Sequence, residues 1–510
     1  MTSPADLTST VTDAGERWPR PYPRAVDEQP RGIDPDDLAT TLRVLEELTE
    51  LPAGHPDIHV VKQATGRMYR KIRKSRRAHA RRPQQEADAA VLASTATGSP
   101  MRIDDETRGI RLVSSAPGAY AGELNTPRGC YICHADYTLV DAFYHWLCPA
   151  CAAMSHVKRD QRTDLTGRRA LLTGGRAKIG MYIALMLLRD GAHMTITTRF
   201  PRDAVRRFTE LADSPEWIDR LKIVGIDLRD PTQVIALADD VAAAGPLDIL
   251  INNAAQTVRR SPGSYSHLVH GEDEPLDTHE PMPELVTFDR ISEAHPAALL
   301  GSLAKHPVPH ADLDAASMTK LALRAGQASL EAHVAGTAID AGGLLPDLQR
   351  TNSWTQTVSE VDPLELLEVQ LCNSTAPFLL VSRLRPSLAA SPARRTYVVN
   401  VSAMEGQFSR RYKGAGHPHT NMAKAALNML TRTSAAEMLE TDGILMTAVD
   451  TGWITDERPH DEKLRIAAEG WHAPLDLVDG AARVYDPIVR GEAGEDLHGV
   501  FLKNFAPHPW

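Results

Sequence analysis

Residues 169–180 decide the fold, and they read Arg-Ala-Leu-Leu-Thr-Gly-Gly-Arg-Ala-Lys-Ile-Gly. An apolar strand at residues 169–172 runs into a glycine-rich turn, and a helix is expected over residues 181–189. Backbone N–H groups at such a turn, together with the positive end of the helix dipole, can bind a pyrophosphate. The stretch therefore predicts a strand–turn–helix unit that binds a nucleotide.

Further apolar strands follow along the chain, and each ends in small or polar residues. We predict them at residues 194–198, 223–226, 247–251, 396–401 and 445–449. Their ends carry Asp227-Leu228, Asn252-Asn253-Ala254-Ala255, Ser402 and Thr451-Gly452. Strands that alternate with helical segments are typical of an α/β fold with a parallel sheet.

These motifs, in this order, resemble the short-chain dehydrogenase/reductase (SDR) family. The resemblance covers residues from about 165 to 510, apart from one long insertion, and Asn373 and Lys424 also match it. It implies a Rossmann-type doubly wound parallel sheet, a nicotinamide cofactor, a small-molecule substrate and assembly as a homo-oligomer.

The cofactor is expected to be NADP rather than NAD. Gly174 and Gly180 keep the family pattern, whereas Lys178 replaces its middle glycine and Arg176 lies in the same loop. Arg199 follows the second strand, where NAD-preferring relatives carry an acidic residue for the ribose 2′-hydroxyl. A guanidinium there suits a 2′-phosphate, although a merely solvated arginine is the alternative. By resemblance, the other cofactor-binding positions are Thr173, Ile179, Asp227, Leu228, Asn252, Ala254, Lys424, Thr451 and Gly452.

The proton-transfer residues depart from the family pattern. The family's tyrosine lies four residues before the lysine, where this chain has Thr420. The family's serine aligns with Ala403, so that Ser402 lies one residue early. Loss of a positioned general acid typically slows a reaction by about 10²–10⁴-fold. The candidate catalytic residues are Asn373, Ser402, Thr420, Lys424, Tyr412 and His417.

Three interpretations of the altered site remain open. Another residue supplies the proton, and Tyr412, His417 and His419 lie on the loop that leads to Lys424. Alternatively, the substrate is an enone or iminium that needs no strong acid. In the third, the domain is a catalytically inactive NADP-binding scaffold or redox-state sensor. We expect an NADP-dependent oxidoreductase that transfers hydride to or from a small-molecule carbonyl, alcohol, enone or imine.

Four of the five cysteines fall in two close pairs. Cys130-x2-Cys133 and Cys148-x2-Cys151 are separated by fourteen residues, a spacing typical of zinc ribbons. All four positions are cysteine, so the predicted zinc is structural, in a module over residues 121–160. The fifth, Cys372, is expected to be buried as a small apolar residue.

The N-terminal part is predicted to be a disordered tail over residues 1–30 and a helical region over residues 31–120. Leu38, Leu42, Leu45 and Leu48 recur at helical spacing and predict a helix with one buried face. A basic run at residues 70–77 follows. It could contact nucleic acid, but a solvated helix face is favoured because no aromatic residues are interleaved.

The insertion spans about residues 257–362. Its first half, residues 262–310, is acidic and rich in proline and histidine. This composition fits a lid or oligomer arm and a disordered segment equally well. A more ordered part is expected after it, helical at residues 318–334 and then at residues 344–361.

Length and composition limit the remaining possibilities. A chain of 510 residues is too long for a single core, its hydrophobic content of 42% is typical of globular proteins, and its net charge of −10 is mild. No run of about eighteen apolar residues predicts a membrane span, and the first residues do not resemble a secretory signal. A cytoplasmic location is expected.

Overall fold

The computed structural model describes residues 32–102, 112, 114–260, 262–276, 281–288, 292, 294–296, 343–345, 347, 349–410, 413–455 and 457–510. The chain separates into two compact units, Met1–Pro83 and Gln84–Trp510. The boundary therefore falls inside the region predicted to be helical, over residues 31–120. No described helix is long and apolar enough to cross a membrane.

The first unit contains two helices, α1 (Pro35–Glu47) and the start of α2 (Pro56–Ala93). The Asp34 carboxylate caps α1 by accepting the backbone N–H groups of Asp36 and Asp37. The predicted helix is thus confirmed, but its predicted buried face is wrong. No residue of α1 is buried, and the Leu42 side chain is 55% exposed, because the described part of this unit is too small to cover it.

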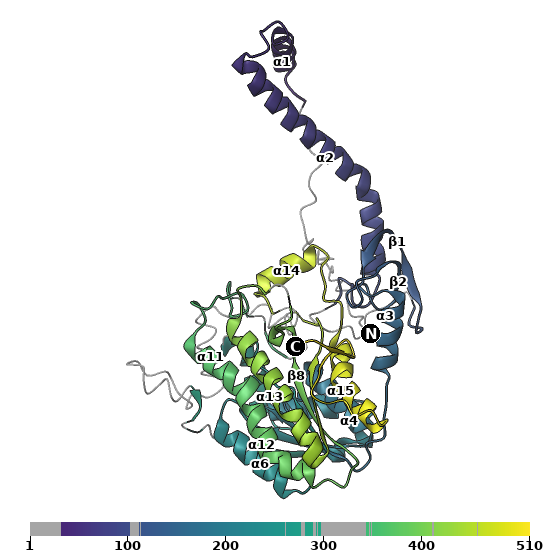
Figure 1. Cartoon of the computed structure of the whole chain (residues 1–510), viewed down its shortest axis with the longest axis vertical. Helices are drawn as coiled ribbons and strands as arrows, with labels where there is room; N and C mark the ends of the chain where they lie inside the picture. The colour runs from purple at the N-terminus through teal and green to yellow at the C-terminus, as the bar shows by residue number, and fades with distance from the viewer. Residues whose placement is uncertain are drawn as a thin grey trace, which may run out of the picture. The chain divides into compact units, whose positions relative to one another are not determined.

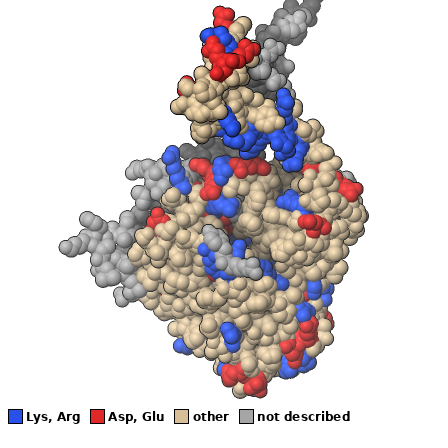
Figure 2. Space-filling model, turned by 45° about the horizontal axis from the view of Figure 1, so that its top comes forward, with Lys and Arg blue, Asp and Glu red and all other residues tan. Residues whose placement is uncertain are grey.

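The basic run lies on α2, and its side chains are exposed. Figure 2 shows blue Lys and Arg side chains gathered over this helix, below the red acidic side chains of α1. The exposed positions agree with the expectation of a solvated face.

The cysteine-rich segment begins the second unit. The hairpin β1 (Tyr120–Gly129) and β2 (Asp136–Asp141) pairs antiparallel, and α3 (Pro149–Arg159) follows. Its apolar core joins that of the larger domain, since Leu124, Tyr144 and Leu147 cluster with Ile454 and Leu475. The module therefore packs against the domain that follows it.

A nine-stranded sheet forms the centre of the second unit (Figure 1). Its strand order is β11-β10-β9-β8-β6-β3-β4-β5-β7, and every neighbouring pair is parallel except β10 and β11. This arrangement confirms the predicted doubly wound sheet. The strands are β3 (Arg169–Leu172), β4 (His193–Thr198), β5 (Leu221–Gly225), β6 (Ile249–Asn252), β7 (Glu284–Thr287), β8 (Thr396–Ser402), β9 (Ile444–Asp450), β10 (Phe501–Lys503) and β11 (Ala506–His508).

Helices cover both faces of the sheet, because alternate side chains of each strand point to opposite faces. In β3, Leu172 belongs to the core beneath α4, α5 and α15, whereas Leu171 belongs to the core beneath α6, α12 and α13. Figure 1 shows α6, α12 and α13 together on one face. The helices are α4 (Lys178–Arg189), α5 (Pro201–Thr209), α6 (Pro231–Ala243), α7 (Ser266–Asp273), α11 (Pro363–Gln370), α12 (Ala376–Ala389), α13 (Pro418–Asp442), α14 (His460–Ala468) and α15 (Leu477–Glu492).

The described part of the insertion is ordered and adds to the sheet. It contains a 3₁₀ turn (Pro262–Tyr265), α7 and β7, and β7 pairs parallel with β5. The helix expected at residues 318–334 lies outside the described residues. The helix expected at residues 344–361 is wrong where it is described, since residues 350–361 contain turns and α11 begins after the cap residue Asp362.

Candidate cofactor and active site

The glycine turn is tied to the end of the neighbouring strand β6. The Thr173 hydroxyl oxygen accepts the backbone N–H groups of Asn253 and Ala254, each at 3.0 Å. The Asn253 side-chain amide donates in return to the carbonyl oxygens of Thr173 and Gly174. These bonds join the carboxyl ends of β3 and β6, where ligands bind in open α/β sheets.

Two positions explain the local sequence of the turn. A Cβ at Gly180 would lie 2.0 Å from the Gly174 carbonyl oxygen, so any larger residue would break the turn. Lys178 adopts a left-handed φ of 53°, the conformation that glycine favours, at the position where the family has a glycine. The turn therefore keeps its shape although one glycine is absent.

A cavity of about 390 Å³ opens at this turn, at the N-terminus of α4. It brings together nine of the predicted cofactor residues, namely Gly174, Arg176, Lys178, Ile179, Gly180, Arg199, Asp227, Leu228 and Ala254. Thr173, Asn252, Lys424, Thr451 and Gly452 are not among the described residues that line it. Gln256 and the insertion line it too, the insertion through Thr257, Val258, Arg260, Tyr265 and Leu344.

The two arginines predicted to bind the 2′-phosphate have different surroundings. Arg176 forms an ion pair with Asp203, which also pairs with Arg207 at 2.7 Å. The Arg199 guanidinium instead lies over the rings of Phe200, at 5.7 Å, and Tyr265, at 5.1 Å. Within the described residues Arg199 has no carboxylate partner, so it is the arginine whose charge is available to an anion.

Asp227 is engaged inside the protein. Burial acts to raise the pKa of its carboxyl group, but hydrogen bonds from His295 and Arg229 outweigh it and hold that pKa well below its usual range. Arg229 also donates to Glu368 at 2.9 Å. The carboxylate therefore stays charged and orders the cavity wall at the end of β5.

Lys424 lies on α13, one helical turn after Thr420. Its ammonium group is buried and donates to the Val401 carbonyl oxygen at 2.8 Å. Burial lowers the pKa of Lys424 to about 8. Gly406 lets the loop after β8 lie against α13, because a Cβ there would be 2.6 Å from the Lys424 carbonyl oxygen.

The other predicted catalytic side chains are bonded to the protein. The Ser402 hydroxyl is buried and donates to Asn428 at 2.5 Å, and the Thr420 hydroxyl makes a long bond of 3.5 Å to the Thr257 carbonyl oxygen. Asn373, in a π-helical turn (Leu371–Thr375), both donates to and accepts from the Gln256 backbone, at 2.9 and 2.7 Å. The neighbouring Cys372 is buried, as predicted.

The alternative proton donors lie around the start of α13, since His417 is its cap residue and His419, expected on the preceding loop, lies in its first turn. His417 stacks on Trp354 of the insertion, with ring centroids 4.0 Å apart, and its Nδ1 lies 2.9 Å from the Trp354 carbonyl oxygen. That contact favours the tautomer with a proton on Nδ1. His419 is buried 4.0 Å from Glu365, and burial lowers its pKa. Tyr412 lies outside the described residues.

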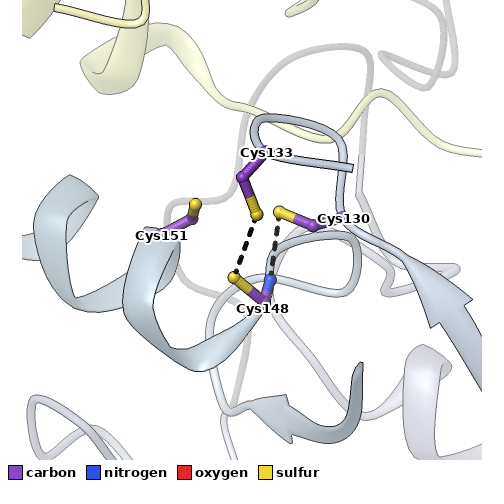
Figure 3. Close-up of side chains that lie close together, drawn as sticks. All are labelled: Cys130, Cys133, Cys148 and Cys151. Atoms are coloured by element: carbon purple, nitrogen blue, oxygen red, sulfur yellow. Dashed lines mark hydrogen bonds between the residues drawn. The ribbon is translucent and has the colours of Figure 1, made fainter. Parts of the chain in front are cut away.

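The four predicted metal ligands converge in the cysteine-rich module (Figure 3). Their sulfur atoms lie within 4.8 Å of one another, and the Sγ atoms of Cys133 and Cys148 are 3.6 Å apart. Sulfurs in a tetrahedron around one Zn²⁺ are roughly 3.8 Å apart, from Zn–S bonds of about 2.3 Å. Cys130 and Cys133 border the turn after β1, and Cys148 and Cys151 border the start of α3, so the cluster could hold one metal ion.

Sequence reasoning missed several residues of the site. Tyr265, Trp354 and Glu368 come from or border the insertion, Arg102 precedes the cysteine module, and Tyr131 lies within that module. None of them lies in a local motif, and each reaches the site through contacts between segments far apart in the chain. No pattern in the sequence would have found them.

Comparisons with known proteins agree with this geometry. The family model described as short chain dehydrogenase matches residues 168–268. The chain is 29% identical over 373 residues to the "Uncharacterized protein R665" of Acanthamoeba polyphaga mimivirus, covering 71% of each. It is 42% identical over 91 residues to a "Probable oxidoreductase" of Streptomyces antibioticus, covering 18% of this chain and 30% of that protein.

The matches to proteins named as oxidoreductases are short. A short chain dehydrogenase/reductase of Colletotrichum higginsianum, dpchG, is 36% identical over 101 residues, which span 37% of its length. The match of the family model begins at β3 and includes the glycine turn, and the described strands continue the same fold beyond it. Residues 168–268, from β3 to α7, therefore match the short-chain dehydrogenase/reductase family, and the described strands continue the parallel sheet beyond them.

Proposed function

We propose that this chain is an NADP-dependent oxidoreductase with an altered proton-transfer site. The observation that carries the proposal is the cavity at the glycine turn, in which Arg199 has no described carboxylate partner. NADPH, when bound, would supply a hydride for a small-molecule carbonyl, enone or imine, and NADP⁺ would accept one from an alcohol. The activity of the SDR-type relatives makes this class of chemistry the first to test.

The residues present fit such a cofactor. The backbone of the glycine turn and the N-terminus of α4 would hold the pyrophosphate, and Arg199 would bind the 2′-phosphate. The Asn252 Oδ1 atom is buried and accepts no hydrogen bond from the described residues, so it has capacity for a ligand donor. Lys424 would bind the nicotinamide ribose, as the resemblance implies.

Proton transfer is where this site would differ from the family. Because the hydroxyl groups of Ser402 and Thr420 already donate to Asn428 and Thr257, neither supports a role as a strong acid. Lys424, with a pKa of about 8, is mostly protonated at neutral pH and is the cation buried in this corner. Enones and iminium ions, which need little acid assistance, are therefore the substrates that the site favours.

The hydrogen bonds of the Ser402 and Thr420 hydroxyl groups also favour a second function. A chain that binds NADPH but orients no proton donor would act as a cofactor-binding scaffold or a redox-state sensor. Lys424 serves both functions, since it would bind the ribose in each. The two are separated by turnover and not by cofactor affinity.

The test combines binding with a substrate screen. NADPH affinity is measured by fluorescence titration, and NADPH oxidation is followed with carbonyl, enone and imine substrates. The proposal expects tight NADPH binding and turnover with at least one enone or imine. Tight binding without turnover on any panel member would favour the scaffold, and absence of NADPH binding would refute both.

A variant panel identifies the proton donor. His417→Phe keeps a ring that can stack on Trp354 but removes the ring nitrogens. If His417 supplies the proton, turnover should fall by about 10²-fold or more while NADPH affinity is unchanged. Unchanged turnover would discard the histidine. Thr420→Tyr combined with Ala403→Ser restores the family pattern and should raise activity towards simple carbonyls.

We further propose that the cysteine cluster binds one structural zinc ion. Four thiolates and no open position support a structural role rather than a catalytic one. Metal analysis of the purified protein should give one zinc per chain. Cys130→Ser with Cys148→Ser should remove the metal and leave the module protease-sensitive, since zinc binding contributes on the order of 10–16 kcal/mol in small modules. Folded protein without zinc would refute the assignment.

A further inference from the structure

The loop between β9 and α15, residues 451–476, borders the cofactor cavity. Glu457 of this loop lines that cavity together with Gly174 and Arg199. The loop carries α14 and two tryptophans, Trp453 and Trp471, whose rings lie 4.7 Å apart. Whatever fixes this loop also fixes one side of the site.

One buried arginine holds both ends of the loop. The Arg102 guanidinium donates to the carbonyl oxygens of Ala473 at 2.6 Å and Leu475 at 2.5 Å, near the end of the loop. It also donates to Ile454 at 3.3 Å, near its beginning. The Arg102 residue is 8% exposed, so these bonds are shielded from water. Arg102 itself is anchored to the Thr97 carbonyl oxygen, next to the cysteine module.

The cysteine module makes a second contact with the same loop. Tyr131 follows Cys130 directly, and its hydroxyl oxygen accepts the Trp453 backbone N–H at 2.9 Å. Trp146, two residues before Cys148, lies 6.5 Å from the Trp453 ring. Because Tyr131 sits between two metal-ligand positions, the geometry of the cysteine turn determines where its hydroxyl lies.

The module also holds the start of α15, just after the loop. Arg159 of α3 forms an ion pair with Asp476, the cap residue of α15. Tyr144 donates to Asp479 at 2.6 Å. Ile454, Leu475 and Leu477 belong to the same apolar cluster as the module's own core. The loop is thus bonded to the module at both ends, through polar and apolar contacts.

We propose that the four-cysteine module positions the loop at residues 453–475, so that metal in the cysteine cluster controls the side of the site that this loop forms. Arg102 and Tyr131 are the positioning residues. The backbone of the glycine turn has its own hydrogen bonds, through Thr173 and Asn253, although Ile179 at the start of α4 packs against the same apolar cluster as the loop. The inference deepens the proposed function, because it assigns to the cysteine module the positioning of one side of the site. It rests on the proposed function, since the loop matters for turnover only if the site binds cofactor and substrate.

Limited proteolysis tests the linkage without any assay of activity. Arg102→Met removes the guanidinium donors, and mass spectrometry then follows cleavage within residues 455–471. Cleavage there should become at least about tenfold faster than in the unmodified chain, because the loop opens locally. Arg102→Lys should restore part of the protection. An unchanged cleavage rate would overturn the proposal.

Arg169→Met is the matched control. Arg169 also donates to backbone carbonyl oxygens, those of Pro246 and Val241, but at the opposite ends of the strands. Its replacement should leave cleavage at residues 455–471 unchanged. Should Arg102→Met fail to fold, Tyr131→Phe removes a single acceptor for the Trp453 N–H and should accelerate the same cleavage by a smaller factor.

Metal removal supplies the second arm. Treatment of the full-length protein with a zinc chelator should accelerate cleavage at residues 455–471 and change the tryptophan fluorescence through Trp453 and Trp146. Cleavage of the module with no change in the loop would overturn the linkage. NADPH affinity of Arg102→Met should stay within about twofold, whereas the KM for an accepted substrate should rise about tenfold.

Failure of the linkage between module and loop can be distinguished from failure of the proposed function. If the unmodified protein binds no NADPH, the cofactor proposal fails, while the cleavage rates still decide whether the module holds the loop. If NADPH affinity falls with Arg102→Met as far as loop protection does, the module supports the whole site and the proposed separation is wrong.

Discussion

The cofactor end and the proton-transfer end of this sheet differ in what their polar groups contact. At the cofactor end, the Arg199 guanidinium and the Asn252 Oδ1 atom keep capacity for a ligand within the described residues. At the proton-transfer end, Ser402 and Thr420 have protein partners. Under the proposed function, this difference means that the chain keeps the groups that would bind the cofactor, whereas the hydroxyl groups expected at the proton-transfer end are bonded to the protein.

Lys424 would serve both ends of the site, because its ammonium group would bind the cofactor and would also place a positive charge beside the reacting group. Its ammonium is buried with a carbonyl oxygen as its hydrogen-bond acceptor. Among the described residues no carboxylate forms an ion pair with it, and burial of such an ammonium destabilises the folded chain, so its presence is more easily explained by function than by stability.

The largest effect is expected at the glycine turn. Gly180→Ala would place a Cβ 2.0 Å from the Gly174 carbonyl oxygen and 2.8 Å from the Asn253 amide. NADPH affinity should fall by about a hundredfold or more, with a loss of about 3 kcal/mol in unfolding free energy. Gly66→Ala, whose Cβ would meet nothing closer than 3.7 Å, is the control. Intact NADPH binding in Gly180→Ala would show that the turn is not the binding element.

Lys424→Met should separate stability from binding. The pKa of Lys424 is about 8 when folded, below the value of about 10.4 for a free lysine, so the folded state is destabilised by about 3 kcal/mol below pH 8. That destabilisation disappears as pH rises from 8 to 10.4, because the unfolded chain then binds more protons than the folded one.

The measurement is chemical denaturation of both proteins between pH 7 and 10.5. Lys424→Met should be the more stable at pH 7 by up to about 3 kcal/mol and lose that advantage by pH 10.5, while binding NADPH more weakly. Lys62→Met, at an exposed position of α2, serves as the control. A pH-independent difference would mean that Lys424 is not buried as an ammonium.

Arg199→Ala should affect NADPH alone. One charge-assisted contact contributes about 1.5–3 kcal/mol, so NADPH affinity should fall roughly ten- to a hundredfold and NADH affinity should hardly change. Arg176→Ala is the matched variant and should have the smaller effect, because Arg176 is paired with Asp203. Equal affinities of the unmodified protein for NADH and NADPH would contradict this assignment.

The smallest effect is expected at the proton-transfer end. Ser402→Ala leaves the Asn428 side-chain oxygen without its donor and should reduce stability by about 1–2 kcal/mol. Turnover and NADPH affinity should stay the same, because the hydroxyl points to Asn428. A fall in turnover without loss of stability would show that Ser402 is a catalytic residue.

Local patterns predicted much of the fold. The strands, the glycine turn and the cysteine pairs depend on residues close together in sequence, and they appear within a few residues of where they were expected. The prediction that one face of α1 is buried was wrong, because the spacing of apolar residues shows that a helix has an apolar face but not whether another segment covers that face. The partners of Arg176, Ser402 and Arg102 were missed because tertiary contacts choose them.

The insertion shows the same limit. An acidic, proline-rich composition gave no sign that Glu284–Thr287 forms a strand. Four residues are too few for a periodic pattern, and the pairing with β5 decides their conformation. The cofactor cavity likewise contains Tyr265, whose place depends on the same folding of the insertion.

The strand β7 has a consequence for any attempt to shorten this chain. It covers the hydrogen-bonding edge of β5, and Lys222 pairs with Glu284 across the two strands at 3.1 Å. Trimming the chain to the usual family length would leave the N–H and C=O groups of β5 open to strands of other molecules. Residues that look dispensable by comparison with shorter relatives are thus part of the sheet, and we expect their removal to promote aggregation.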